Sequence, residues 1–503
     1  MAFLVGGCVR DLLIGLEPKD FDVATDALPE QVRKLFRNCR LVGRRFRLAH
    51  VFFGRDIIEV ATFRAASAPA PGEEPLPEAD AVEAEDRELE QSALGPGALS
   101  DVDLEEEVED GADLEDEDDE EDEDDPMGDD AGQPPRAYAV SRRPEYRQRF
   151  AGPNGDESAA DLDVDPNLDA DSERMFDATG RILRDNVYGT IDADVWRRDF
   201  TANALYYNIA DFSIWDYVGG FEDIAARKLK LIGDPETRFR EDPVRMLRGA
   251  RFEAKLGFEL DPATAEPIER LKTLLGGVPP ARLFDETLKL FLTGHGRRSF
   301  EVLRRRGLLA ALLPSVDAYF NKHPGSVVEQ LVRQGLENTD ARVLADKPVT
   351  PTFLFALLLY GPIAAIIEST PPERWHELST ILGACDRAAR EVQQRVTLPK
   401  RFSLGMREMF ALQPRLEHPR GRRALRVLEH PRFRAAYDLL LLRAEYGLAA
   451  TEIAQWWTRI QEVSAEERGR MADALTGQAQ RADMAPRRGG RRRRRRRGPS
   501  PSA

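Results

Sequence analysis

Residues 3–27, FLVGGCVRDLLIGLEPKDFDVATDA, decide the fold of the first part of the chain. The triplet FLV predicts a buried strand that ends at Gly6 and Gly7, where the backbone can turn tightly and approach a ligand. VRDLLIG predicts a short helix ended by Gly15, because the proline three residues later blocks its continuation. The backbone N–H groups of the glycine turn and the cation of Arg10 are suited to a triphosphate.

A pair of acidic residues follows in KDFDVAT, which predicts a second strand. Residues two apart in a strand point to the same face, so we expect Asp20 and Asp22 to lie side by side. Phe21 and Val23 would then point into the core. Two carboxylates beside a glycine turn form a suitable seat for two Mg²⁺ ions, which stabilise the attacking and leaving oxygens of a displacement. On spacing alone, aspartates flanking a short strand are more often solvated turn residues.

GGCVRDLLIG and the later DFD resemble the first motif of the class II template-independent nucleotidyltransferases. This family of the DNA polymerase β superfamily comprises the CCA-adding tRNA enzymes and the bacterial poly(A) polymerases. The resemblance implies that Asp20 and Asp22 hold two Mg²⁺ ions. It also implies a third carboxylate, for which Asp199 and Glu59 are the candidates. Glu59 lies in DIIEVATFR, a predicted strand, and an ordinary strand-edge acid is the alternative interpretation.

Further along the chain, RRDFTANAL resembles the second motif of the same family. The resemblance assigns four residues to the catalytic centre and to the recognition of nucleotide ribose and phosphate: Arg197, Arg198, Asp199 and Asn203. From the residues alone, WRRDFTANALYYN predicts the start of a helix, with Asp199 near its positive end and two solvated arginines before it.

REDPVRMLRGARF completes the resemblance and predicts a long helix with Pro243 in its first turn. Asp242 and Arg245 lie three apart, on one face. The family reads the incoming base with this motif, the carboxylate accepting from an exocyclic amine and the guanidinium donating to ring nitrogens or carbonyls. The alternative is an intrahelical ion pair worth roughly a few tenths of a kcal/mol. Arg248 and Arg251 extend the cationic face, and we include Arg248 among the nucleotide-binding residues.

Residues 29–40, PEQVRKLFRNCR, predict an amphipathic helix with Val32, Leu35 and Phe36 on its apolar face. GRRFRLAHVFF then predicts a basic turn that leads into a strand. The cations of this turn either meet phosphates or remain solvated, and their local excess modestly favours phosphate: Arg44, Arg45 and Arg47.

Charge is divided unevenly along the 503 residues, whose net charge is −17. Residues 71–135 contain 30 acids and one base, so the rest of the chain carries a net charge of +12. A basic body with a separate acidic insertion is typical of a protein that meets a polyanion. Residues 101–130 are acidic at 21 of 30 positions, so we expect the insertion, at about 66–177, to be disordered. It either competes with RNA for the basic surface or acts as a solubilising spacer.

The C-terminal sequence PRRGGRRRRRRR contains nine arginines within Arg487–Arg497. Such a run predicts a disordered tail whose natural partner is a phosphate backbone, with the acidic insertion as an intramolecular competitor. The RNA-binding residues expected in the tail are Arg491, Arg492, Arg493, Arg494, Arg495, Arg496 and Arg497.

Several classes of protein are excluded by composition. Cys8, Cys39 and Cys385, with no CxxC motif, exclude a disulfide framework and indicate a reducing cytosol. Six scattered histidines offer no structural zinc site. The first residues lack the pattern of a signal peptide, and the most apolar run, Phe353–Ile367, is interrupted by Gly-Pro and too short to span a bilayer. We therefore expect a cytoplasmic protein with no membrane partner.

Together these patterns, with the resemblance, predict an α+β fold. An N-terminal polymerase β-like nucleotidyltransferase head with a small mixed sheet and helices precedes an all-α neck and body. We expect the head at 1–212, a base- and RNA-binding neck at 213–275, an all-α RNA-binding body at 276–470 and the tail at 471–503. Because the family has a leader before the first strand, we expect an upstream start or a less stable head.

Within the family, RKLFRNCRLVGRRFRLAHV and IGDPETRFREDPVRMLR resemble the bacterial poly(A) polymerases more than the CCA-adding enzymes. This implies template-independent transfer of AMP from ATP to the 3′ ends of mRNA and small RNAs, with two Mg²⁺ ions. A CCA-adding tRNA nucleotidyltransferase is the nearer alternative. A non-catalytic RNA-binding adaptor is the alternative from another class.

Removing the tail after Pro486 should flatten the salt dependence of RNA binding. Each phosphate contact releases counterions, which adds about 0.7 to the slope of log affinity against log salt for a single strand. Filter binding over a range of KCl concentrations measures the slope for the full-length and truncated proteins, and identical slopes would reject a role for the tail.

Overall fold

The computed structural model describes residues 1–43, 47–54, 56–65, 140–142, 174–176, 182–185 and 188–484. They divide into two compact units, Met1–Val278 with Arg305–Leu308, and Pro279–Arg304 with Leu309 onward. The first unit holds both the expected head and the expected neck. Some predicted features lie outside the described residues: Arg44, Arg45, the acidic run 71–135 and the tail arginines Arg491–Arg497.

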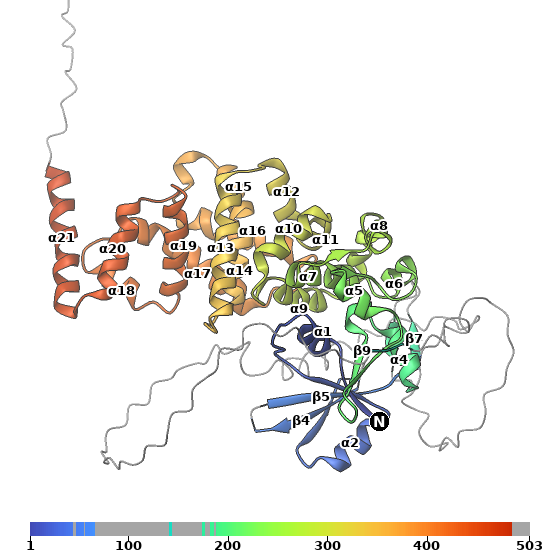
Figure 1. The fold of residues 1–503 in the computed structure, drawn as a ribbon. Coiled ribbons are helices and arrows are strands. Elements are labelled where there is room, and N and C mark those ends of the chain that lie inside the picture. Colours follow the sequence, from blue (N-terminus) through green and yellow to red (C-terminus); the bar gives the residue numbers. More distant parts are fainter. Residues whose placement is uncertain are drawn as a thin grey trace, which may run out of the picture. The chain divides into compact units, whose positions relative to one another are not determined.

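A mixed sheet forms the centre of the first unit (Figure 1), as predicted. Its strand order is β3-β4-β5-β2-β1-β9-β10-β6, in which β2 with β5 and β10 with β6 are parallel and the other pairs antiparallel. The strands are β1 (Ala2–Val5), β2 (Asp22–Thr25), β3 (Cys39–Val42), β4 (Leu48–Phe53), β5 (Asp56–Thr62), β6 (Val140–Arg142), β9 (Leu205–Asn208) and β10 (Ser213–Asp216). Two further pairs are β7 (Arg174–Phe176) with β8 (Ile182–Asp185) and β11 (Lys228–Leu229) with β12 (Glu259–Leu260). Strands β6 and β7 lie within residues 66–177, and the predicted disorder of that segment stays a prediction.

Helices cover the sheet and continue beyond it. Val32 of α2 packs with Ala49 and Val51 of β4 on one face of the sheet. Figure 1 shows helix α2 beneath the blue strands. Val195 of α4 packs with Tyr206 of β9 in a second core cluster. The helices of this unit are α1 (Gly7–Leu13), α2 (Pro29–Leu35), α4 (Ile191–Arg197), α5 (Gly220–Ala225), α6 (Pro235–Glu241), α7 (Val244–Leu256) and α8 (Pro262–Leu271), with 3₁₀ turns η3 (Thr201–Asn203) and η4 (Lys272–Gly277).

Helix α2 is shorter than residues 29–40 predict. It ends at Leu35, and strand β3 begins at Cys39, so the chain must leave the helix after two turns. Leu35 is 77% exposed and Phe36 is 36% exposed. The predicted apolar face is therefore wrong for these two residues, and Val32 alone of the three is buried.

The predicted helix start at WRRDFTANALYYN is also wrong. Helix α4 ends at Arg197, η3 follows, and β9 begins at Leu205. The carboxylate of Asp199 caps no α-helix; it accepts from the N–H of Phe200 and from side chains described below. The aromatic pair at 206 and 207 suits a strand, and pairing with β1 and β10 overrides the helical spacing.

The two ends of the long excursion between β5 and α4 are joined. Arg64 and Tyr188 form an antiparallel bridge, and the N–H of Gly189 donates to the carbonyl of Phe63 at 2.9 Å. A Cβ atom on Gly189 would lie 2.6 Å from the Cα of Ala65, so only glycine permits this approach. The residues just after β5 and just before α4 are thus held together by backbone hydrogen bonding.

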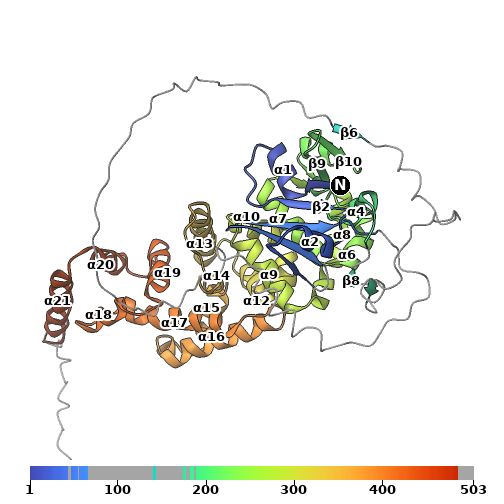
Figure 2. The ribbon, with the colours of Figure 1, turned by 90° about the horizontal axis from the view of Figure 1, so that it is seen from below.

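The second unit consists of helices, as predicted for the body. Figure 2 shows α15, α16 and α17 side by side, and α14 and α19 also contact α17. Within the described residues no single helix passes the length and apolarity test for a membrane span, although the pair α14 and α15, bent by 47°, passes it together. The helices are α9 (Pro280–Phe291), α10 (Gly296–Arg305), α11 (Leu308–Leu312), α12 (Pro314–Lys322), α13 (Val327–Leu344), α14 (Pro351–Leu358), α15 (Tyr360–Glu368), α16 (Leu378–Gln393), α17 (Lys400–Glu417), α18 (Arg423–Leu428), α19 (Phe433–Glu445), α20 (Thr451–Glu462) and α21 (Ala465–Met484), with the 3₁₀ turn η5 (Pro372–Arg374).

Candidate active site

The glycine turn after β1 faces an acidic and a basic side chain. Gly6 has φ +78°, and a Cβ atom there would lie 3.8 Å from Nη1 of Arg198 and 4.0 Å from Oδ2 of Asp22. The N–H of Gly6 donates to the carbonyl of Leu205 at 3.3 Å. The absence of a side chain at Gly6 therefore leaves space between the charged groups of Arg198 and Asp22. The N–H of Gly6 is already bonded to β9. Gly7 is the first residue of α1.

Asp22 is the first residue of β2, and Asp20 lies just before that strand. Asp22 is partly buried and Asp20 is exposed. Phe21, predicted to point into the core, is 41% exposed because the strand begins only after it. Val23 is the cross-strand neighbour of Val60, which belongs to the cluster under α2, so its predicted direction fits.

Two other carboxylates, those of Glu59 and Asp20, lie close enough to Asp22 to raise its pKa. Burial, and then the negative charges of Glu59 and Asp20, raise the pKa of Asp22 to about 6, against the opposing effect of Arg198. Glu59 reaches this position because it is the partner of Asp22 across the parallel pair β2–β5. The closeness of Asp20 and Asp22 was expected from their spacing in the sequence. The pairing of Asp22 with Glu59 depends on the register of β2 with β5, which the sequence does not show.

The carboxylate set fits a hard divalent cation. Among the described residues, no three His, Cys, Asp or Glu side chains form a ready-made metal cage. Mg²⁺ is commonly held by one or two carboxylates and by substrate phosphates rather than by such a cage. The carboxylates of Asp20, Asp22 and Glu59 supply negatively charged oxygen donors, which suit that ion. Asp20 is exposed, so a ligand can reach the group from solvent.

A buried network orients Arg198. Its Nε donates to the hydroxyl of Tyr206 at 2.8 Å and its Nη2 to Oδ2 of Asp194 at 3.0 Å, while Tyr206 donates to the same Oδ2 at 2.7 Å. Burial alone would lower the pKa of Arg198, but Tyr206 and Asp194 raise it above its ordinary value. These bonds use Nε and Nη2 and leave Nη1 toward the glycine turn. Asp194 and Tyr206 escaped the motif analysis, although the i, i+4 spacing of Asp194 and Arg198 was a signal.

Asp199 is committed to protein partners. Its Oδ2 accepts two hydrogen bonds from Arg248, at 2.9 and 2.5 Å, and its Oδ1 accepts from Phe200 and Asn203. Although burial opposes it, Arg248 and these donors hold the pKa of Asp199 well below its usual range. Asn203 in turn accepts from Arg10, which is 2% exposed and also binds Asp11. Asp199 is thus paired with Arg248, whereas Glu59 is the cross-strand partner of Asp22, and Arg10 is paired with Asn203 and Asp11.

Arg238 joins the two later motifs. Its Nη2 donates to the carbonyls of Arg197 and Arg198, both at 2.8 Å, and its Nη1 to Glu241 at 2.6 Å. Arg245 donates to the same Glu241 oxygen at 3.0 Å and to the carbonyl of Arg238 at 2.7 Å. Burial, followed by the charge of Arg245, lowers the pKa of Arg238 to about 10.

Asp242 follows this cluster as the C-cap of α6, and its Oδ1 accepts from the N–H of Val244 at 3.3 Å. Helix α7 then begins at Val244, with Pro243 as its N-cap. The predicted helix is therefore present, although Pro243 precedes its first residue, and the backbone N–H of Arg245 donates to the carbonyl of Asp242 at 3.1 Å. Arg245 pairs with Glu241, and sequence analysis missed Arg238 and Glu241.

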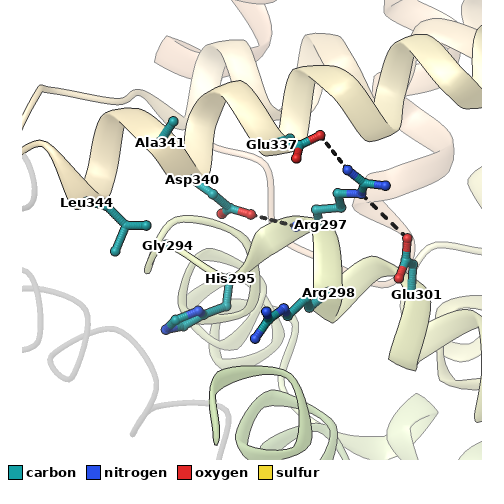
Figure 3. Close-up of a pocket in the computed structure, with 9 residues that line it drawn as sticks. All are labelled: Gly294, His295, Arg297, Arg298, Glu301, Glu337, Asp340, Ala341 and Leu344. Atoms are coloured by element: carbon teal, nitrogen blue, oxygen red, sulfur yellow. Dashed lines mark hydrogen bonds and ion pairs between the residues drawn. The ribbon is translucent and has the colours of Figure 1, made fainter. Parts of the chain in front are cut away.

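A separate cavity of about 600 Å³ lies in the second unit, between the start of α10 and α13 (Figure 3). Asp340 accepts from the N–H groups of Gly296 and Arg297 there, and Arg297 pairs with Glu337 and Glu301. The acidic and basic side chains that line the cavity thus largely neutralise one another, so the cavity is not suited to binding a polyanion. None of the residues predicted for nucleotide binding lines it.

Comparison with known proteins gives three family matches. Residues 2–93 and 147–230 match the poly A polymerase head domain. Residues 257–320 match the probable RNA and SrmB-binding site of polymerase A, and residues 373–498 match the arginine-rich C-terminus of polymerase A.

Poly(A) polymerase I of Escherichia coli O157:H7 is 40% identical over 465 residues, which cover 92% of this chain and 79% of that protein. Poly(A) polymerase I of Haemophilus influenzae is 38% identical over 474 residues, 93% of this chain and 82% of that protein. The CCA-adding enzyme of Bacillus subtilis is 27% identical over 302 residues, 60% of this chain and 49% of that enzyme. A solved tRNA-processing enzyme aligns over 95% of this chain and 96% of its own, with 17% identity and a TM-score of 0.49.

Replacing Asp22 with Asn should stabilise the free protein at pH 8. The folded-state pKa of Asp22 is raised from 3.8 to about 6, so ionisation opposes folding above pH 6, by roughly 1–3 kcal/mol. The gain should shrink as the pH falls through 6 and vanish below about 4, where the wild-type carboxyl is protonated in both states. Urea unfolding of both proteins at pH 4, 6 and 8 measures this, and a gain independent of pH would contradict the raised pKa of Asp22.

Proposed function

The chain belongs to the poly(A) polymerase I family, whose members are nucleotidyltransferases, and we propose that it adds AMP from ATP to RNA 3′ ends without a template. The observation that carries this proposal at the site is geometric: Asp22 is the cross-strand partner of Glu59, and it lies beside the glycine turn, where a Cβ atom on Gly6 would be 4.0 Å from its Oδ2. Such a pair of carboxylates is costly to maintain without a ligand that uses it.

We assign Asp20, Asp22 and Glu59 to the holding of two Mg²⁺ ions. When bound, the ions would activate the RNA 3′-hydroxyl and neutralise the charge of the triphosphate. Asp20 is exposed and Asp22 half buried, so the set can reach both a bound nucleotide and the incoming hydroxyl. Asp199 holds Arg248 in place, which orders that guanidinium for nucleotide recognition.

Arg198 is assigned to the triphosphate. Tyr206 and Asp194 fix its guanidinium beside the glycine turn, so its charge is positioned before the nucleotide arrives. A preorganised cation stabilises the negative charge that develops on the leaving pyrophosphate without reorganisation at the moment of transfer. Gly7, Arg10, Arg197 and Asn203 complete the nucleotide-binding set of the prediction.

Asp242 and Arg245 are assigned to the adenine base. Glu241 and the carbonyl of Arg238 each accept from Nη1 of Arg245, which restricts the orientation of its guanidinium. A restricted donor paired with a nearby carboxylate can discriminate among base edges by leaving a wrong base unpaired. The family matches to the RNA-binding segment and the arginine-rich C-terminus support RNA as the other substrate.

The decisive experiment compares two primers. An oligo(A) primer with ATP and Mg²⁺ should be extended into long A tracts, as proposed, whereas exact restoration of CCA on tRNA lacking its terminus would instead indicate the CCA-adding activity. An absence of pyrophosphate release with either primer would leave an RNA-binding adaptor.

Replacing either Asp20 or Asp22 with Ala should lower kcat for AMP transfer by about a thousandfold or more, because each removes a metal ligand worth several kcal/mol in the transition state. RNA binding should persist, since neither residue contacts the primer backbone in this proposal. Primer extension and filter binding measure the two properties. Asp56→Ala is the matched control, because Asp56 is an exposed acid that begins β5. Retained turnover in both site variants would refute the assignment.

Asp242→Asn and Arg245→Lys should reduce the preference for ATP over CTP by roughly tenfold, since a lost or misplaced hydrogen bond leaves the base edge unpaired. The ratio of kcat/KM for the two nucleotides is the measurement. Arg240→Ala serves as the control, because Arg240 is an exposed residue of α6 whose guanidinium pairs with Glu236. An unchanged ratio in both site variants counts against base reading by this motif.

A further inference from the structure

A row of polar side chains crosses three neighbouring strands at the site. His50 of β4 is opposite Glu59 in the antiparallel pair β4–β5, and Glu59 is opposite Asp22 in the parallel pair β2–β5. Residues directly opposite in a sheet project from the same face. The alternating neighbours of His50, Ala49 and Val51, pack against α2 on the other face. His50 therefore belongs to the face that carries the carboxylates.

His50 contacts the most exposed member of this row. Its Nε2 lies 3.3 Å from Oε1 of Glu59, and His50 is 6% exposed whereas the Glu59 side chain is 48% exposed. A buried imidazole has one orientation imposed by its surroundings, while an exposed glutamate can rotate about three bonds. The contact with the fixed imidazole of His50 thus restricts the rotation of the Glu59 side chain.

We propose that His50 is a positioning residue that holds the Glu59 carboxylate toward Asp22, so that two strands present a preassembled pair of carboxylates to a divalent cation. This inference rests on the proposed function of the site. His50 lies in the otherwise apolar strand LAHVFF. Groups that hydrogen-bond a ligating side chain typically change metal affinity or activity by about 10- to 100-fold when removed.

The test measures Mn²⁺ binding by electron paramagnetic resonance, without nucleotide or RNA, beside AMP transfer. His50→Leu removes the N–H donor at similar volume and should weaken Mn²⁺ binding and lower kcat by roughly tenfold. His50→Gln keeps a donor and should recover most of both. In a Glu59→Gln background, His50→Leu should have no further effect, because the group that it positions is no longer a metal-binding carboxylate.

Val51→Ala is the matched control, since it thins the core under the same strand on the opposite face. It should lower the melting temperature while Mn²⁺ affinity stays at the wild-type value. If His50→Leu fails to fold, His50→Asn replaces it, because its shorter side chain cannot bring a donor to Glu59.

The outcomes separate two failures. A wild-type protein that neither binds Mn²⁺ nor transfers AMP overturns the proposed function. A wild-type protein that does both, with His50→Leu equal to it in both, overturns only the role of His50. Equal losses in the Leu and Gln variants, or additive losses in the Glu59→Gln background, also overturn that role.

Discussion

The partial burial of a carboxylate beside two others, at the start of β2, is the constraint around which the site in the first unit is arranged. Burial, and then the negative charges of Glu59 and Asp20, raise the pKa of Asp22 to about 6. At neutral pH the folded chain therefore carries a charge arrangement that favours unfolding. The sheet maintains it by pairing β1, β2 and β5 in fixed register. Such local instability is typical of sites whose ligand supplies the missing countercharge.

Around this acidic centre, cations are fixed by buried partners. Asp194 and Tyr206 hold Arg198, Asp199 holds Arg248, and Glu241 joins Arg238 to Arg245. Removing one partner from a buried pair leaves an uncompensated charge, so these contacts specify geometry more strongly than they add stability. They connect segments that lie about 50 residues apart into one arrangement, as the bond from Arg248 to Asp199 illustrates.

The sequence predicted residue types and failed on long-range geometry. Spacing and resemblance made Asp20 and Asp22 candidate metal ligands, and resemblance added Glu59 and the later motifs as candidates. These assignments were possible because each motif consists of residues that are close together in the sequence. The helix expected after Asp199 is instead a 3₁₀ turn and a strand, since tertiary pairing outweighs local periodicity. Neither His50 nor Arg238 could be assigned, because no pattern within a strand or helix gives cross-strand register or a carbonyl partner 40 residues away.

The bridge between Arg64 and Tyr188 has a consequence for the length of the chain between them. Since both ends of the excursion are held together by backbone hydrogen bonding, its contour length is decoupled from the position of the carboxylates that precede it. Loop-closure entropy grows only with the logarithm of length, so each doubling costs about 0.6 kcal/mol. Added length between these anchors outside β6 therefore costs little free energy and leaves the register of β2 with β5 unchanged.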